Sequence, residues 1–460
     1  MAQPAHAPAQ REMLTEDAHR LILRLCAPSV LAMLSSSLGT LLDALFISRS
    51  GAAMTAAVGV SFPLLAALQA IGFTLGMGAG SFMSRSLGRG DAQAARQAAS
   101  CALVAALAFS AGLAALGFCF SAPLLRLLGA TDAVLAPGIV YARYVLLGGP
   151  LLCAGLVLSS LLRGQGRTWP NFFAYAAGSV VGALVCWLLA VRRGMGLHGA
   201  GIAFLAREGV TLLVLALFTW RGDLRPTPRL FTLRAAMWAD IMRSGVPTLL
   251  RQGLISASGV LLNRVSASFG DTALAGMSLA VRAATLVSSA VIGFGQGFQP
   301  VCGFATGAKD FPRVRRAYRF CQAVVCVSLA AVGAALFFFA LPALRLTGAQ
   351  EDVAAFGARV LRAQAPVLFA QGAVIMMNML TQSMGQTVRA SLVATSRQGY
   401  VFLPLLFLLT RLWGETGLVL AQSVSDLISL PLCLLLTRGA IPDDAPKRAP
   451  DDARFPALAD

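Results

Sequence analysis

Apolar runs of helix length follow one another along almost the whole chain, separated by short polar connections. A bilayer core is about 30 Å thick, and a helix needs about 20 apolar residues to cross it. Because lipid offers no hydrogen-bond partner to backbone groups, such runs must fold as helices. We expect twelve spans and no soluble catalytic domain, at about 22–48, 55–84, 95–122, 136–162, 171–191, 197–220, 239–267, 272–304, 315–341, 353–383, 391–411 and 415–437.

The composition is typical of a polytopic membrane protein. Hydrophobic residues make up 57% of the 460 residues and charged residues 12%, with a mean hydropathy of +0.73, values far from those of a soluble domain. The nine cysteines lie in apolar segments without a CxxC pair, and the three histidines lack metal-ligand spacing. We therefore predict no metal site and no cofactor. No small-residue cleavage site follows the first span, so we expect a retained helix instead of a signal peptide.

The connections predict the orientation of the chain. If the N-terminus is cytoplasmic, the connections on that side hold 24 Lys and Arg residues and the opposite ones hold six. The positive-inside rule then places both termini in the cytoplasm. This topology accounts for the net charge of +17, so we expect the lipid bilayer, and no nucleic acid, as the partner of the basic residues.

The sequence repeats itself with a shift of 219 residues. Pro28 falls on Pro247 and Asp91 on Asp310, and glycines at 51, 76, 78, 129 and 166 fall on glycines at 270, 295, 297, 348 and 385. Six spans return the chain to its starting side, so the two units are parallel repeats with a cleft between them. We predict an all-α integral membrane protein of two pseudo-symmetric six-helix bundles. The expected parts are an N-terminal arm (1–21), an N-lobe (22–220), a linker (221–238), a C-lobe (239–437) and a tail (438–460).

The first span carries a single acid, Asp43. Ser36, Thr40 and Asp43 are spaced i, i+4 and i+7, so they share one face of a helix. An ionised carboxylate in a span costs roughly 2.5 to 3.5 kcal/mol, and such an acid usually faces a bundle interior or a watery cavity. Asp43 is our first functional candidate. The alternative is that it joins helices through a hydrogen bond or an arginine partner.

Each of the other polar residues within the spans allows a structural and a functional interpretation. Glu208 and Asp426 occupy equivalent places in the two units, which favours helix pairing within each bundle over ion coupling. Gln296, Gln299, Asn378, Gln382 and Gln398 are candidates for a cavity wall, or they join helices. Arginines that line a cleft would suit anionic groups; the candidates are Arg143, Arg251, Arg264 and Arg282. The glycine-rich stretches 73–91 and 292–310 favour close helix packing over ligand contact.

Several segments resemble the multidrug and toxic compound extrusion (MATE) family, in its DinF-like and MepA-like bacterial branch. They are LLDALFIS with AAVGVSFPLL, SRSLGRGD, GVPTLLRQG, GFGQGFQPVCGFATGAKDFPRVRRA and TQSMGQTVRASLVATSRQG, within residues 27–437. The resemblance implies export of small organic compounds, often cationic and amphipathic, from the bacterial cytoplasm in exchange for H+ or Na+. It also implies that Asp43 is the helix-one acid whose protonation is coupled to release of the exported compound.

The chain departs from the family pattern in its fifth span. Family members of this branch often carry an Asn and an Asp there, where this sequence has Gly182 and Cys186, and we find no acid in the interior of spans seven to eleven. H+ coupling through Asp43 is therefore favoured over Na+ coupling. A flippase or exporter of a lipid-linked or anionic amphiphile is the alternative function. A membrane-embedded enzyme would need a zinc motif, a catalytic dyad or a soluble loop, and we expect a monomeric transporter instead.

Overall fold

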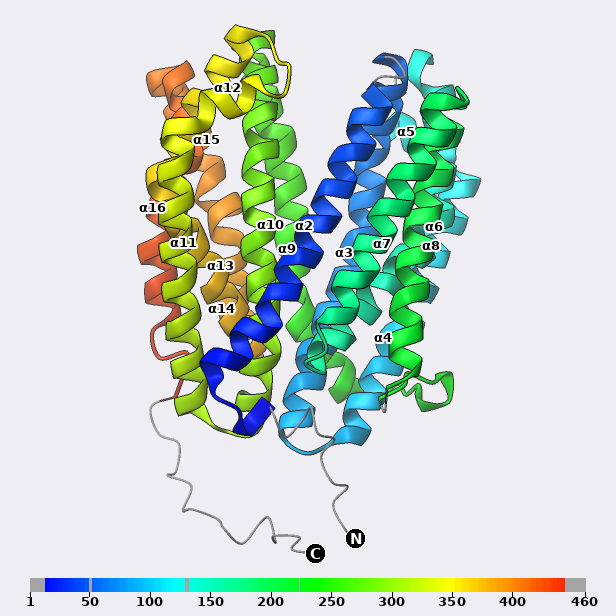
Figure 1. Cartoon of the computed structure of the whole chain (residues 1–460), viewed down its shortest axis with the longest axis vertical. Helices are drawn as coiled ribbons and strands as arrows, with labels where there is room; N and C mark the ends of the chain where they lie inside the picture. The colour runs from blue at the N-terminus through cyan, green and yellow to red at the C-terminus, as the bar shows by residue number, and fades with distance from the viewer. Residues whose placement is uncertain (1–12, 49–51, 129–131, 223, 443–460) are drawn as a thin grey trace, which may run out of the picture.

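The computed structural model describes residues 13–48, 52–128, 132–222 and 224–442, and these ranges are helical almost throughout (Figure 1). The predicted twelve-helix, two-bundle architecture is confirmed. In the first half lie α2 (Ala18–Ser48), α3 (Ala52–Gly88), α4 (Ala92–Cys119), α5 (Ser121–Leu127), α6 (Asp132–Gly164), α7 (Trp169–Cys186) with the π-helical η1 (Trp187–Arg192), and α8 (Gly196–Trp220).

The second half follows the same order after the short 3-10 turn η2 (Pro228–Leu230). It contains α9 (Ala235–Ala267), α10 (Asp271–Gly307), α11 (Phe311–Arg345), α12 (Glu351–Gln364), η3 (Ala365–Val367), α13 (Leu368–Ser383), α14 (Thr387–Thr395), η4 (Ser396–Tyr400), α15 (Phe402–Trp413) and α16 (Glu415–Thr437). Three of the spans are composite, because short 3-10 or π-helical turns interrupt them.

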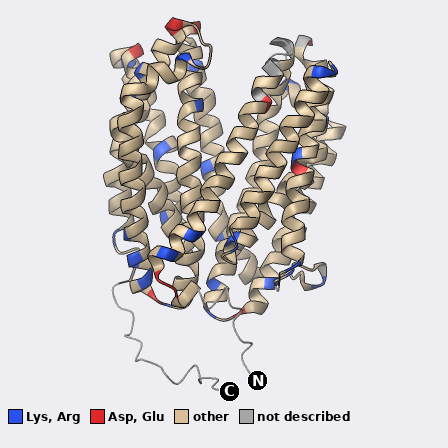
Figure 2. Ribbon diagram, in the orientation of Figure 1, with Lys and Arg blue, Asp and Glu red and all other residues tan. Residues whose placement is uncertain are grey.

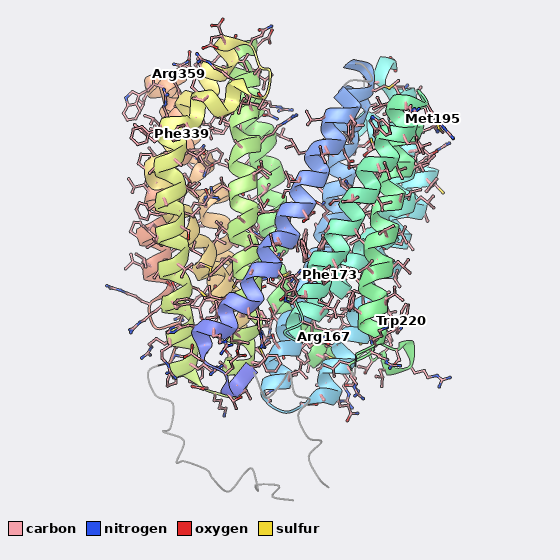
Figure 3. All side chains as sticks on the ribbon, viewed as in Figure 1. Arg167, Phe173, Met195, Trp220, Phe339 and Arg359 are labelled. Carbon is pink, nitrogen blue, oxygen red and sulfur yellow. The ribbon has the colours of Figure 1, made fainter. Side chains whose placement is uncertain are left out.

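Eleven helical segments of the described ranges are long and apolar enough to cross a membrane. The remaining span is α9, which is 33 residues long and less apolar, since it carries Asp240, Arg243, Arg251 and Arg264. Large apolar side chains such as Phe173, Trp220 and Phe339 are exposed on the outside of the lobes (Figure 3). An exposed apolar surface of this extent is expected of a chain that lies in lipid.

Five helices, α2, α6, α9, α11 and α14, begin four residues before their predicted starts, and side-chain hydrogen bonds hold the first turns of α2 and α9. Asp17 accepts hydrogen bonds from the backbone N–H groups of His19 (2.9 Å) and Arg20 (3.3 Å), which cap α2 and hold the pKa of the Asp17 carboxyl below its usual range. The first turn of α9 is held by Trp238, whose indole N–H donates to the carbonyl oxygen of Thr232 at 2.9 Å. Side-chain bonds outside the apolar runs thus extend both helices.

The repeat in the sequence is a repeat in backbone conformation. Asp91 accepts a hydrogen bond from the N–H of Ala94 and caps α4, and Asp310 does the same for α11 through Arg313. The residues before these caps, Gly90 and Lys309, both have positive φ, 83° and 59°. The equivalent turns at glycines 166 and 385 (77° and 75°) and 196 and 414 (52° and 56°) also match.

The two lobes meet through α2, α3, α9 and α10. In Figure 1, α2 runs obliquely from beside α10 to beside α7, so the first helix contacts both lobes. Cys26 of α2 donates to the carbonyl oxygen of Phe294 (3.2 Å), and Ser37 is bonded to Ser289 (2.8 Å), both on α10. On another face of α2, near its middle, Ser179 of α7 donates to the carbonyl oxygen of Ser35 at 2.9 Å.

The glycine-rich stretches form the closest contacts between the lobes. A Cβ added to Gly88 of α3 would lie 2.2 Å from the carbonyl oxygen of Phe304, and one on Gly307 of α10 would lie 2.1 Å from that of Arg85. Arg85 itself donates to the carbonyl oxygen of Ser383 (3.1 Å) and the hydroxyl of Ser244 (3.0 Å), both in the C-lobe. The lobes are therefore locked at the end that carries both termini, while the opposite ends stand apart (Figure 1).

We expect Gly307→Ala to weaken this locked end. The new methyl group would collide with the carbonyl oxygen of Arg85, and overpacking of this kind costs about 1 to 3 kcal/mol. Moving α10 away from α3 relieves it. Double electron–electron resonance between spin labels attached at positions 93 and 316 should show a population with longer distances between the labels. Gly112→Ala, where nothing lies within 4 Å, is the control, and identical distance distributions for the two variants would contradict the assignment.

Candidate functional site

A three-residue charge cluster lies inside the N-lobe, with Arg207 of α8 at its centre. The guanidinium of Arg207 donates through one terminal nitrogen to the Asp43 carboxylate on α2, and its Nε donates to Glu208 Oε1 at 3.1 Å. The side chains of Arg207, Asp43 and Glu208 are 16%, 21% and 12% exposed. Asp43 therefore has an arginine partner, the alternative considered for it from the sequence, and the partner is Arg207, which is not one of the four arginines named there as candidates.

Two glycines of α7 make room for this arginine. A Cβ on Gly182 would lie 2.9 Å from the Cβ and 3.3 Å from the Cγ of Arg207, and one on Gly178 would lie 2.0 Å from the hydroxyl of Thr211. The guanidinium also lies 5.3 Å from the ring of Phe204, within cation–π range. A larger side chain at position 182 would occupy the space through which Arg207 reaches Asp43.

The cluster opens into a cavity of about 710 Å³ in the N-lobe. Ser36, Thr40 and Gln296 line it, as do Arg207 and Glu208. Asp43 is not among the lining residues, but it contacts Arg207, which is. Gln296 comes from α10, so the C-lobe contributes to the wall. The other lining side chains are polar or adaptable and include Met33, Gln69, Phe73, Arg163, Tyr175, Ser179 and Thr211.

Gln299 and Gln382 lie closer to the locked end. Gln299 and Gln296 line a smaller cavity of about 260 Å³ together with Arg163. The amide of Gln299 donates to that of Gln382 at 3.3 Å, and the amide of Gln382 donates to the hydroxyl of Thr248 at 2.6 Å. Gln382 therefore joins α13 to α9 and α10.

Asn378 joins two helices. Its side-chain amide donates to the carbonyl oxygen of Ala390 at 2.9 Å, across α13 and α14. In the N-lobe the same two repeat positions are Ser159 and Asn171, and there the amide of Asn171 donates to the carbonyl oxygen of Ser159 at 3.1 Å. The bond recurs with the asparagine on the opposite helix, and this repetition in both lobes points to a structural role.

The C-lobe has a charge cluster of its own around Asp426 of α16. Arg397 of η4 donates to this buried carboxylate through Nε (2.5 Å) and a terminal nitrogen (3.4 Å), and Gln422 donates to it at 2.9 Å. Arg397, Gln398 and Gln422 line a cavity of about 830 Å³. Each lobe thus places a carboxylate at the equivalent position, Glu208 or Asp426, against an arginine.

The arginines that line the cavities are not those singled out in the sequence. Arg143, Arg264 and Arg282 are exposed on the surface of the described chain and Arg251 is half-buried, whereas Arg163, Arg207 and Arg397 line cavities. The signal for Arg207 was the glycine at position 182, which leaves space on α7. Among the residues that the structure describes, no group of three His, Cys, Asp or Glu side chains could hold a metal ion.

Two similar six-helix lobes, each with a charged cavity, define a multi-pass membrane protein with a duplicated bundle. The MatE family profile matches residues 28–188 and 247–408, two segments that are related by the 219-residue repeat. The chain therefore belongs to the MatE family.

Individual relatives agree over nearly the full length. The multidrug export protein MepA of Staphylococcus aureus (strain MSSA476) is 22% identical over 424 residues, which cover 91% of this chain and 94% of MepA. MepA of Staphylococcus haemolyticus is 21% identical over 431 residues, covering 91% and 92%.

Solved structures show the same fold. An Asp-to-Asn variant of the Vibrio cholerae MATE transporter VcmN superimposes with a TM-score of 0.86 at 21% identity, covering 95% of this chain and 99% of that one. A multidrug resistance MATE family transporter in its outward-facing conformation gives a TM-score of 0.89 at 23% identity, covering 96% and 99%.

We expect Asp426→Asn to destabilise the protein strongly, because it leaves the Arg397 charge without its carboxylate. Breaking a buried pair typically costs about 3 to 5 kcal/mol, while replacing both partners by apolar residues is often neutral. The melting temperature in detergent should fall for Asp426→Asn and recover in Asp426→Leu with Arg397→Met. Glu415→Gln, which breaks the exposed pair with Arg359, is the control, expected to cost about 0 to 1 kcal/mol. Equal losses for Asp426→Asn and Glu415→Gln would refute the assignment.

Proposed function

We propose that this chain is a secondary antiporter that exports small organic compounds in exchange for protons, with Asp43 as the coupling acid. The observation that carries the proposal is the position of Asp43. It lies one turn beyond Thr40, which lines the N-lobe cavity, and it is held by Arg207 of α8, a cation that lines the same cavity. A proton bound to Asp43 removes its charge and weakens the link between α2 and α8.

The fold offers a route from this site to the lobes. Because α2 packs against α7 in the N-lobe and α10 in the C-lobe, a change in how α2 is held at Asp43 alters a contact between the lobes. The lobes are locked at one end through Arg85 and the glycine contacts of α3 and α10. Exchange of this lock for one at the opposite end is the rocking motion of alternating access.

The cavity suits an amphipathic organic compound. Met33, Phe73 and Tyr175 offer adaptable apolar and aromatic surface, and Ser36 and Gln69 offer hydrogen bonds. The Staphylococcus relatives are multidrug export proteins, which supports a broad range of substrates. That the substrates are cationic is inferred from the family resemblance.

We place the protein in the bacterial cytoplasmic membrane with both termini in the cytoplasm. The excess of Lys and Arg in one set of connections supports this orientation, and Figure 2 shows many of these residues at the end near the termini. In this orientation the locked end faces the cytoplasm, the open end faces outward, and Asp43 lies in the outer half of α2.

Proton coupling is testable in everted membrane vesicles that have been acidified inside. When ethidium is added, we expect wild-type vesicles to release protons, seen as recovery of the fluorescence of a pH-gradient dye. Asp43→Asn cannot bind and release a proton at this position, so its response should fall to that of vesicles without the protein. Asp271→Asn alters an exposed acid at the start of α10 and should respond as wild type. Equal proton release from wild type and Asp43→Asn would rule out Asp43 as the coupling acid.

A second candidate function rests on Arg163 and Arg207, which both line the N-lobe cavity. Guanidinium groups bind carboxylates and phosphates, so this wall favours a flippase or exporter of an anionic or lipid-linked amphiphile.

Purified protein in liposomes separates the two functions. The antiporter proposal predicts that an imposed pH gradient drives ethidium accumulation, while a fluorescent anionic phospholipid stays in its leaflet, as judged by protection from dithionite. Loss of that protection without ethidium transport would favour the flippase and overturn the antiporter.

A further inference from the structure

We propose that Arg207 is the internal counter-cation of the N-lobe, a positioning residue that holds Asp43 and Glu208 and restricts the coupling site to protons. The inference deepens the proposed function and rests on Asp43 as the coupling acid. In this proposal the guanidinium of Arg207 occupies the place between the Asp43 and Glu208 carboxylates that a bound metal cation would otherwise take.

The geometry of Arg207 supports this role. Its Nε binds Glu208 and a terminal nitrogen binds Asp43, so a single planar guanidinium connects acids from α8 and α2. Guanidinium has five donors in a fixed arrangement and stays charged at any physiological pH. Both carboxylates are therefore offered a cation that never leaves the protein, and a hard cation such as Na+ would have to displace it to gain their oxygens.

The site around Arg207 is shaped for an arginine. The stem of Arg207 passes Gly182, where a Cβ would come within 2.9 Å of it, and the ring of Phe204 covers the guanidinium. Thr211, one turn further along α8, donates to the backbone oxygen of Arg207 at 2.8 Å and fills the space beside Gly178. Gly182 leaves space on α7, and the long side chain of Arg207 on α8 fills that space and brings its positive charge to Asp43.

The other groups near the cluster do not compete for protons between pH 5 and 8. Tyr141 of α6 and Cys186 of α7 interact electrostatically with Arg207 and Asp43, and Tyr175 of α7 interacts with Glu208 and with Arg163 of α6. The tyrosine and cysteine reference values, about 10 and 8.5, lie above this range. A pH response in that interval therefore reports the two carboxylates and the cation between them.

The counter-cation couples protonation of Asp43 to the link between α2 and α8. A proton from the outer solution that binds Asp43 ends its ion pair with Arg207, and the guanidinium keeps Glu208 as its partner. The site then carries one fewer negative charge and α2 is no longer tied to α8. When the proton leaves, Asp43 regains Arg207 and the link is restored. Glu208 holds the arginine near its working position throughout this cycle.

The decisive variant is Arg207→Gln, which is similar in length and neutral. Two carboxylates without their cation bind a first proton more readily, so we expect the pH profile of ethidium transport to move upward by about one unit. The same pair offers oxygen ligands, so NaCl, compared with choline chloride, should raise the melting temperature of the purified variant by about 3 °C or more. Wild type and Arg207→Lys should show neither effect, and the exposed Arg143→Gln is the matched control.

A wild-type pH profile together with no Na+ effect in Arg207→Gln would overturn the proposal. If Arg207→Gln fails to fold, Gly182→Val decides the question by the same two readouts, because it displaces the stem of Arg207 without removing a charge. Proton release by Asp43→Asn equal to that of wild type is a failure of the proposed function. Loss of coupling in Asp43→Asn with wild-type behaviour in Arg207→Gln is a failure of the Arg207 assignment alone.

Discussion

The structure depends on the close approach of α3 and α10, where the two lobes meet. Glycines 88 and 307 bring each backbone against a carbonyl oxygen of the other helix, and Arg85 adds hydrogen bonds from α3 to two C-lobe helices. Without a hydrophobic driving force between helices in lipid, small residues and polar bonds are what hold such an interface. Apolar side chains are buried there as well, since Met83 and Leu87 of α3 belong to the same core cluster as Phe298 and Phe304 of α10.

Charge in the membrane interior imposes the second constraint, and the two lobes meet it differently. Glu208 and Asp426 occupy the same repeat position, and each is neutralised by an arginine. In the N-lobe the arginine is the preceding residue of α8. In the C-lobe that position is Ser425, which donates to the backbone oxygen of Arg397 (3.1 Å), and the arginine comes from η4. Of these two arginines, only Arg207 also reaches an acid on α2. The C-lobe pair therefore joins η4 to α16, whereas the N-lobe pair extends to the helix that contacts both lobes.

The sequence predicted the features that depend on local patterns. Apolar length predicted the helices. The 219-residue shift aligned Asp91 with Asp310, and the structure shows that both cap helices. Helical spacing put Ser36 and Thr40 on one face with Asp43, and both line the N-lobe cavity. It could not predict the partner of Asp43, because Arg207 is 164 residues away and the rotation of α8 about its axis decides which acid it meets. Nor could it separate Gln296, which faces a cavity, from Gln382, whose amide joins helices. Both are buried amides on apolar helices, and only their neighbours tell them apart.

The position of α2 connects the two constraints. Its first half lies against α10 through Cys26 and the glycines at 293 and 297, and its last turns carry Asp43 to Arg207. An ordinary helix–helix salt bridge would only add rigidity there. In the proposed mechanism a proton neutralises Asp43, while Arg207 keeps a second acid, Glu208, as its partner. The link can therefore be broken without leaving a buried charge unpaired, which is the main energetic objection to breaking any ion pair inside a membrane. In the proposed mechanism, Glu208 makes the Asp43 pair reversible, and the breaking of that pair has a mechanical effect because it lies on the helix that contacts both lobes.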